Sequence, residues 1–319
     1  MGAAPQALKF FNGIAIPNVR QSRNGVNSRG LMLKAEIRVL EKTEEFRKCE
    51  TAQKSIWGGL SVAAEVMLVT QKAGGAVLGA FVKGKLVGFI YALLARRNGK
   101  IIHWSHMMGI MPAYRSQGVG LQLKLAHRDL ALSQGIKSIC WTYDPLQSRN
   151  ASLNLSKLGA RVEEYVVDYY GRFHSIIEQG LPSDRFVVNW PIASKGIALH
   201  LSGQKNRTRV PDGPIINVTT TNHKGFLANR KIDLGRREPR LLVEIPTDTD
   251  RMREEVLSLA RRWRLQTREI FQNYLSRGYS VSGFLTENTH DDRGSCFYLL
   301  RRNRMKDVRN CRTKPISSD

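Results

Sequence analysis

The sequence predicts an α+β fold with a mixed sheet, followed by a smaller α+β unit near the C-terminus. Two observations carry this prediction. Residues 77–104 contain apolar runs separated by tight glycine turns, which is typical of neighbouring antiparallel strands. Residues 103–145 run instead from a strand through a glycine turn and a helix to a second strand, and such a crossover makes its two strands parallel. A sheet with both kinds of neighbour is mixed.

The elements follow from the periodicity of the apolar residues. Strands alternate between the two faces of a sheet, whereas helices repeat their apolar positions every three or four residues. Glycine and proline mark the ends of several elements, as at Gly58-Gly59 and at Pro112. In order, the predicted elements are strand 36–40, helix 41–56, strand 77–82, strand 86–95, strand 100–110, helix 120–134, strand 137–145, helix 150–158, strand 162–170 and strand 185–192.

The central stretch is residues 103–134. Its first part alternates poorly but is rich in bulky apolar side chains, which predicts a strand buried on both faces. A turn with Gly118 and Gly120 then opens a helix, whose first N–H groups have no intrahelical acceptor and attract anions. A phosphate group fits such a turn, and Arg115 is close enough in sequence to neutralise it. The alternative is a turn whose glycines serve packing alone.

Two sequence motifs in this part of the chain resemble those of a known protein family. Arg115, Gly118 and Gly120 occupy the pattern Arg/Gln-x-x-Gly-x-Gly/Ala, which resembles motif A of the GNAT superfamily of N-acetyltransferases, and MGIMPAYR before it is similar to that family's fourth strand. The text NASLNLSKLGA at residues 150–160 resembles motif B. The chain is also similar to a poorly characterised group of bacterial predicted GNAT acetyltransferases over residues 36–301. The resemblance implies a GNAT-type acyl-CoA N-acyltransferase fold.

The resemblance also implies a substrate and a site. Acetyl-CoA, or another acyl-CoA, would be the co-substrate, and its pantetheine arm would lie between two diverging parallel strands. The backbone of the first strand would hold the pantetheine, the glycine turn would hold the diphosphate, and an asparagine at the start of motif B would contact the cofactor. The Asn150 side chain could equally be a simple helix cap. The implied cofactor-binding residues are Met108, Gly109, Ile110, Arg115, Ser116, Gln117, Gly118, Val119, Gly120, Leu121 and Asn150.

Acyl transfer to an amine needs a group that takes the amine's proton. We expect His106 to be the first candidate for this catalytic base, because an imidazole titrates in the useful range, and Asp144 to be the second. Each has a competing structural account, since His106 could pack within the sheet and Asp144 could cap the turn before Pro145. Many GNAT enzymes carry a tyrosine acid where this chain has Leu155, so the usual acid is missing.

The amino-acid composition indicates which kinds of partner the chain can bind. The chain has 319 residues, and its 50 Lys and Arg against 27 Asp and Glu give a net charge of +23. This excess suits polyanions, which include nucleic acid as well as a cofactor with several phosphates. No apolar run approaches the roughly 20 residues that cross a bilayer. The four cysteines lack metal-site spacing, so we expect no metal site and a reducing, cytoplasmic environment.

The domain boundaries follow from shifts in composition. Residues 1–34 contain no acidic side chain and predict a disordered basic leader or a start assigned too early, rather than a targeting segment. Periodicity begins at residue 35. The expected parts are a GNAT acetyltransferase domain at 35–192, a linker or excursion at 193–240, a small α+β GNAT-like unit at 241–301 and a basic tail at 302–319.

The small unit is predicted as strand, helix, strand and strand, at residues 241–246, 250–277, 279–285 and 296–302. Its helix carries seven arginines, including Arg264 and Arg268. Such a set favours a solvated helical face, with contact to nucleic acid as the less favoured interpretation.

The leading hypothesis is therefore an enzyme that moves an acetyl or short acyl group from coenzyme A to an amine by direct attack in a ternary complex. The alternative is a catalytically reduced acyl-CoA-binding or nucleic-acid-associated protein on the same scaffold, which Leu155 and the basic excess favour. The sequence leaves the acceptor, the acyl length and the oligomeric state open.

Overall fold

The computed structural model describes residues 10–11, 14–15, 33–59, 61–171, 180–203, 213–287 and 295–302. They belong to two compact units. Unit 1 comprises Met1–Cys140 and Pro191–Ala193, and unit 2 comprises Trp141–Trp190 and Ser194–Asp319. The first division falls between Cys140 and Trp141, within a strand. The domain bounds expected from the sequence, at residues 35–192, 193–240 and 241–301, stay a prediction. Most of the predicted leader and the tail beyond Arg302 lie outside the described residues.

Unit 1 is a mixed sheet with helices on both faces. Its strands lie in the order β3-β4-β5-β6-β7, all antiparallel neighbours except β6 and β7, which are parallel as predicted. In chain order the elements are β3 Glu36–Val39, α1 Thr43–Trp57, α2 Ala64–Lys72, β4 Ala76–Val82, β5 Lys85–Arg97, β6 Lys100–Ile110, the 3-10 turn Pro112–Tyr114, α3 Val119–Ser133 and the start of β7 Ile139–Tyr143; a separate short hairpin pairs β1 Phe10–Phe11 with β2 Ile14–Ala15.

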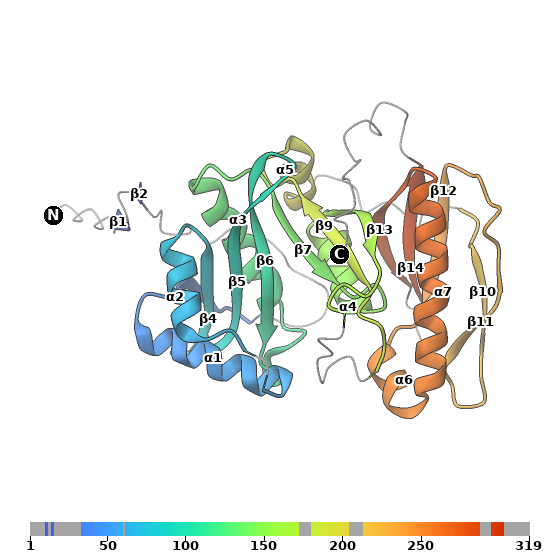
Figure 1. Ribbon diagram of the computed structural model, residues 1–319, viewed down its shortest axis with the longest axis horizontal. Coiled ribbons are helices and arrows are strands. Elements are labelled where there is room, and N and C mark those ends of the chain that lie inside the picture. The colour runs from blue at the N-terminus through green and yellow to red at the C-terminus, as the bar shows by residue number, and fades with distance from the viewer. Residues whose placement is uncertain are drawn as a thin grey trace. The chain divides into compact units, whose positions relative to one another are not determined.

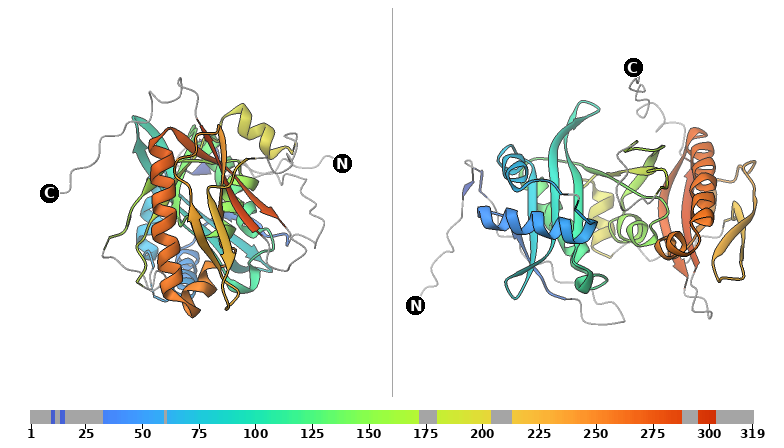
Figure 2. Two further views of the ribbon diagram at one scale, coloured as in Figure 1. Left: turned by 90° about the vertical axis from the view of Figure 1, so that its right-hand side faces the viewer. Right: turned by 60° about the horizontal axis from the view of Figure 1, so that its bottom comes forward.

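The two faces of this sheet have separate cores. Helices α1 and α2 cover one face (Figure 1 and Figure 2). On this face, Phe46, Cys49 and Met67 pack against Phe89 and Tyr91. Helix α3 covers the other face with Val119 and Leu123. The apolar periodicity predicted α1 and α3 but not α2. Burying both faces explains why the strands read as nearly continuous apolar runs.

The strands of unit 2 are antiparallel neighbours in the order β12-β14-β13-β8-β9, and β10 and β11 form a separate hairpin. Helix α7 packs against this sheet and against the hairpin, where Trp263 donates to Leu227 O at 2.7 Å. The elements are α4 Ser148–Ala151, the π-helical turn Ser152–Lys157, β8 Arg161–Val166, β9 Arg185–Trp190, α5 Lys195–Leu201, β10 Asn217–Thr221, β11 Leu227–Ile232, β12 Arg240–Ile245, α6 Thr249–Glu255, α7 Leu257–Ser276, β13 Tyr279–Glu287 and β14 Ser295–Arg302.

Three features of unit 2 differ from the expectations. Residues 193–240 include a helix and a hairpin where an extended connection or a flexible excursion was expected, because short polar strands carry little periodicity. The helix expected at 250–277 breaks at Val256 into α6 and α7. The helix expected at 150–158 is α-helical only to Ala151 and then π-helical. The order strand, helix, strand, strand after residue 240 is as predicted.

Among the described residues, no helix is both long and apolar enough to span a bilayer. The described cysteines, Cys49, Cys140 and Cys296, are buried and form no disulfide.

Candidate acyl-transfer site

A β-bulge interrupts β6 at His106. The antiparallel register with β5 passes from Ser105 opposite Ala92 to Met107 opposite Tyr91, so His106 is an extra residue without a partner across the ladder. Bulges re-aim side chains and are common beside active sites. The poor alternation of residues 103–110 is the trace that this bulge leaves in the sequence.

The bulge places two successive side chains, those of His106 and Met107, on the same face of the sheet. His103 and Ser105 lie on the α3 face, where they contact His127 and Lys124. The next two residues belong to the other face: the exposed His106 ring meets Tyr91 edge-on, and Met107 packs in the cluster with α1 and α2. Partial desolvation lowers the pKa of His106 from its ordinary value of 6.5. The side chain is therefore accessible and neutral at pH 7, as a proton acceptor must be.

The bulge also determines which backbone N–H groups of β6 point away from β5. Met111 donates its N–H to Val87 O across the β5 side at 2.9 Å. Because successive N–H groups of a strand point to opposite edges, those of Ile110 and Met108 point away from β5. The described parallel pairs of β6 with β7 are His103 with Ile139 and Trp104 with Cys140. Ser105–Ile110 continue β6 past these pairs.

The glycine turn follows β6 directly. Ser116 and Gly118 have φ values of 62° and 85°, in the left-handed region that glycine adopts without cost, and Gly118 is the N-cap of α3. The first intrahelical hydrogen bond runs from Gln122 N–H to Gly118 O, so the amides of Val119, Gly120 and Leu121 have no helical acceptor. The exposed side chains of Arg115, Ser116 and Gln117 border these amides in sequence.

Side chains hold this turn in place. Arg115 Nε donates to Ile110 O at 3.1 Å, which fixes its guanidinium at the end of β6, and Gln117 Nε2 donates to Ala113 O at 2.8 Å. Gln122 joins the helix to the start of unit 1, since its side chain accepts from Ala35 N and donates to Leu33 O. The turn is therefore pre-ordered in the absence of a ligand.

A buried polar cluster that the sequence analysis missed lies between α3 and β6. His103 Nε2 is 3.0 Å from Gly74 O, which can only accept, so His103 Nδ1 is the acceptor for His127 Nε2–H, also at 3.0 Å. Burial lowers the pKa of both imidazoles, and both are neutral in this arrangement. Lys124, only 2% exposed, donates to Ser105 Oγ at 3.1 Å, and burial lowers its pKa to about 7.

Asp144, the second candidate base, lies in unit 2 and is engaged. Burial raises the pKa of this carboxyl, but both terminal nitrogens of the Arg264 guanidinium donate to it, one at 2.7 Å, and hold the pKa below its usual range. Asp144 also accepts from Leu146 N at 2.8 Å, the turn-capping contact that the sequence analysis weighed against catalysis. Arg264 is only 2% exposed, so it is no part of the solvated helical face expected for α7.

The two motif B residues singled out in the sequence, Asn150 and Leu155, lie in different surroundings. Asn150 is exposed within α4, whose N-cap is Gln147, so Asn150 is not the cap that was its competing interpretation. Leu155 is 2% exposed in the π-helical turn and offers no proton donor. π-Helical turns are frequent at functional sites. No group of three or more His, Cys, Asp or Glu side chains that could hold a metal ion occurs in the part of the chain that the structure describes.

Part of the chain matches the model of a known protein family. Residues 38–160, which span β6, the glycine turn, α3 and the motif B turn, match the model of the acetyltransferase (GNAT) family. The chain carries a GNAT acetyltransferase domain. This confirms the superfamily inferred from the two motifs, and it supports acyl transfer from coenzyme A as the general activity of the matched region. The narrower bacterial group stays a prediction.

Solved structures of acetyltransferases resemble about half of the chain. The ribosomal-protein-S18-alanine N-acetyltransferase of Escherichia coli is 15% identical over 50% of this chain and 96% of its own, with a TM-score of 0.41. The putative acetyltransferase yncA of Salmonella typhimurium, solved with acetyl-CoA, is 17% identical over 51% of this chain and 96% of its own, also at 0.41. Similarity at these sequence identities and TM-scores carries no argument about the activity of this chain. No curated protein sequence matches the chain.

Proposed function

We propose that the GNAT domain transfers an acetyl or short acyl group from coenzyme A to a neutral amine by direct attack on the thioester. One observation carries this proposal. The bulge at His106 places an accessible imidazole next to strand amides that point away from β5, and the same strand ends at a pre-ordered glycine turn. The proposed base, the N–H groups that would polarise the thioester carbonyl and the anion site then follow one another along β6 and the turn after it.

The backbone of β6 would bind the thioester arm. The N–H groups of Met108 and Ile110 point to the edge away from β5, beyond the described pairs of β6 with β7, where an extended pantetheine can pair with them as an added strand would. A donor that lies at the thioester oxygen stabilises the charge that develops there during attack. Gly109 lies between them with no room for a side chain, because a Cβ there would meet Phe89 at 2.7 Å and Ile56 at 2.8 Å.

The glycine turn would bind the diphosphate. The unsatisfied amides at Val119, Gly120 and Leu121 and the exposed Arg115 supply hydrogen bonds and positive charge, which two adjacent phosphates need. Ser116, Gln117 and Gly118 shape the loop. Asn150 stays a proposed contact of the cofactor, supported by its exposure in motif B.

His106 would take the amine's proton. Its lowered pKa keeps the imidazole neutral at pH 7, and the leaving thiol has an ordinary pKa near 8.5, so it departs without a dedicated acid. The absence of the tyrosine at Leu155 is compatible with such a mechanism. Asp144 stays the second candidate, but its carboxylate would have to be released from Arg264 to accept a proton.

Thiol release tests the proposal. Full-length protein is incubated with acetyl-CoA and a panel of amines, namely small primary amines, peptides with a free α-amino group and peptides with an internal lysine. The expected result is coenzyme A release that depends on one class of amine. Coenzyme A binding without amine-dependent release for any class would contradict it.

A second candidate is a catalytically reduced acyl-CoA-binding protein. The buried Leu155 at the position of the family's tyrosine favours it. It predicts binding of acetyl-CoA with no turnover in the same assay. The buried cysteines Cys49, Cys140 and Cys296, which form no disulfide, support a reducing, cytoplasmic compartment for either function.

A further inference from the structure

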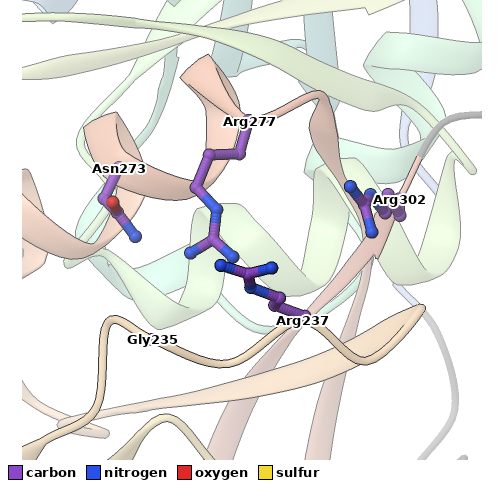
Figure 3. Close-up of a pocket in the computed structure, with 5 residues that line it drawn as sticks. All are labelled: Gly235, Arg237, Asn273, Arg277 and Arg302. Carbon is purple, nitrogen blue, oxygen red and sulfur yellow. The ribbon is translucent and has the colours of Figure 1, made fainter.

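Unit 2 contains a cavity that is lined by arginines. Its volume is about 520 Å³, and the lining residues are Gly235, Arg237, Asn273, Arg277 and Arg302 (Figure 3). They come from three places: the loop after β11, the C-terminal end of α7 and the last residue of β14. Figure 3 shows the guanidinium groups of Arg237 and Arg277 side by side, with that of Arg302 farther along the cavity.

The carboxylates that lie close in sequence to the lining loop pair with an arginine that does not line the cavity. Asp233 and Glu238 flank the lining loop in sequence, and both pair with Arg236, at 3.5 Å and 3.1 Å. Arg236 is not one of the lining residues. Within the described ranges, none of the three lining arginines forms an ion pair. The cavity therefore gathers three positive charges that the described chain does not neutralise.

Arg277 is held rigidly. Its two terminal nitrogens donate to Leu234 O and Arg236 O, each at 2.7 Å, and its guanidinium lies over the Tyr274 ring at 5.1 Å from the centroid. Asn273 Nδ2 also donates to Leu234 O, at 3.2 Å. These contacts use two of the five guanidinium N–H donors. The loop and the remaining donors are thus fixed before any ligand binds, which lowers the entropy cost of binding.

The side chains of Arg237 and Arg302 are exposed and make no hydrogen bond or ion pair in the described part of the chain. Their backbones are anchored, because Arg237 N donates to Glu238 Oε2 and Arg302 N donates to Pro239 O. Anchored backbones with unpaired guanidinium groups allow both side chains to close on a common anion. Two like charges at one cavity repel each other until an anion lies between them.

We propose that Arg237, Arg277 and Arg302 bind the phosphate group of a small phosphorylated ligand. Arginine presents its donors in a planar fork that matches the oxygens of a phosphate, and several such forks around one cavity are typical of phosphate recognition. The volume lies within the roughly 300–1,000 Å³ of small-molecule sites. It exceeds what a bare phosphate fills and leaves room for a sugar-sized group.

The lining favours a small ligand over nucleic acid. Single-stranded nucleic acid is bound by basic grooves in which aromatic side chains stack on the bases. No aromatic residue among those that the structure describes lines this cavity, and Tyr274, which supports Arg277, is fully buried. The site is separate from the acyl-transfer proposal, which uses other residues.

The test uses full-length protein and isothermal calorimetry at low ionic strength, where charge interactions are least screened. The probes are ribose 5-phosphate, ribose, inorganic phosphate and a single-stranded RNA oligonucleotide. The test variant is Arg237→Gln/Arg302→Gln, which removes two exposed side chains. The control is Arg261→Gln/Arg262→Gln, which removes two exposed arginines of α7 that do not line the cavity. Both lose the same net charge, and thermal unfolding without ligand checks that both fold.

The expected result is that ribose 5-phosphate binds the wild type and the control alike, that ribose does not bind, and that the test variant loses at least about tenfold in affinity. Inorganic phosphate should compete for the same site. Absence of ribose 5-phosphate binding, or equal loss in both variants, would overturn the proposal. RNA binding that both variants weaken equally, with no binding of the sugar phosphate, would also overturn it and would indicate general charge attraction.

Discussion

The His106 imidazole lies edge-on to the Tyr91 ring, with 6.1 Å between the ring centroids and 75° between the planes. Tyr91 is 3% exposed, and its hydroxyl lies 3.0 Å from Thr70 Oγ1, so one partner of the pair is fixed by the core. An edge-on contact is a favourable geometry for two aromatic rings. The contact therefore orients the imidazole that the bulge exposes.

Replacing His106 tests its role as base. We expect His106→Gln to lower kcat/KM by about 10²- to 10⁴-fold, the usual contribution of a general base. Because the pKa of His106 lies below 6.5, wild-type kcat/KM should be level near pH 7 and fall as the pH drops through that lowered pKa. The variant should lack this acid limb. A pH profile of initial rates measures both effects.

The control for this prediction is Tyr91→Phe, which keeps the ring against His106 and removes only the hydroxyl. It should retain the acid limb and most of the activity. Wild-type kcat in His106→Gln, with the acid limb unchanged, would remove His106 from the mechanism.

The pair of Asp144 and Arg264 predicts a stability effect. Asp144→Asn should leave the buried Arg264 charge without its carboxylate and destabilise the protein by about 3–5 kcal/mol. Urea unfolding at pH 7 measures this loss. The double variant Asp144→Asn/Arg264→Met should recover part of it, because no buried charge is then left unpaired.

The surface pair of Arg251 and Glu255 supplies the comparison, with side chains 60% and 45% exposed. Glu255→Gln should cost less than about 1 kcal/mol. If Asp144→Asn were equally mild and slowed acyl transfer strongly, its carboxylate would be catalytic and not structural.

Buried Lys124 predicts a pH dependence of stability. Its pKa is about 7 in the folded protein and about 10.5 when exposed, so between these values the unfolded chain binds more protons than the native one. The free energy of unfolding should therefore rise with pH across this window, by up to about 1.4 kcal/mol per pH unit from this group. In Lys124→Met the slope between pH 7 and pH 9 should be smaller by that amount.

Denaturant unfolding at several pH values gives the slope. Lys137 is exposed, so Lys137→Met should follow the wild-type curve. Identical slopes for wild type and Lys124→Met would mean that Lys124 is charged at pH 7 in its buried site.

The prediction from sequence was most accurate in unit 1, where the helices and strands follow from local patterns. The strand, turn and helix of residues 103–134 depend on neighbouring residues, and the structure has them where the pattern predicts. The bulge at His106 left only poor alternation, which does not reveal which residue is extra. Arg264 was read as surface because its partner Asp144 lies 120 residues earlier, and no local pattern reports such a contact. The hairpin of β10 and β11 was missed because its residues alternate weakly.

The most direct measurement is a calorimetric titration of acetyl-CoA into three proteins: wild type, Gly120→Trp and the control Gly196→Trp. Gly120 lies in the first turn of α3, where a bulky side chain would cover the amides proposed for the diphosphate. Gly196 lies in α5 with open space around its Cβ position. The account predicts that wild type and control bind and that Gly120→Trp, folded to a similar melting temperature, does not. Equal affinity in all three proteins, or no heat from the wild type, would contradict it.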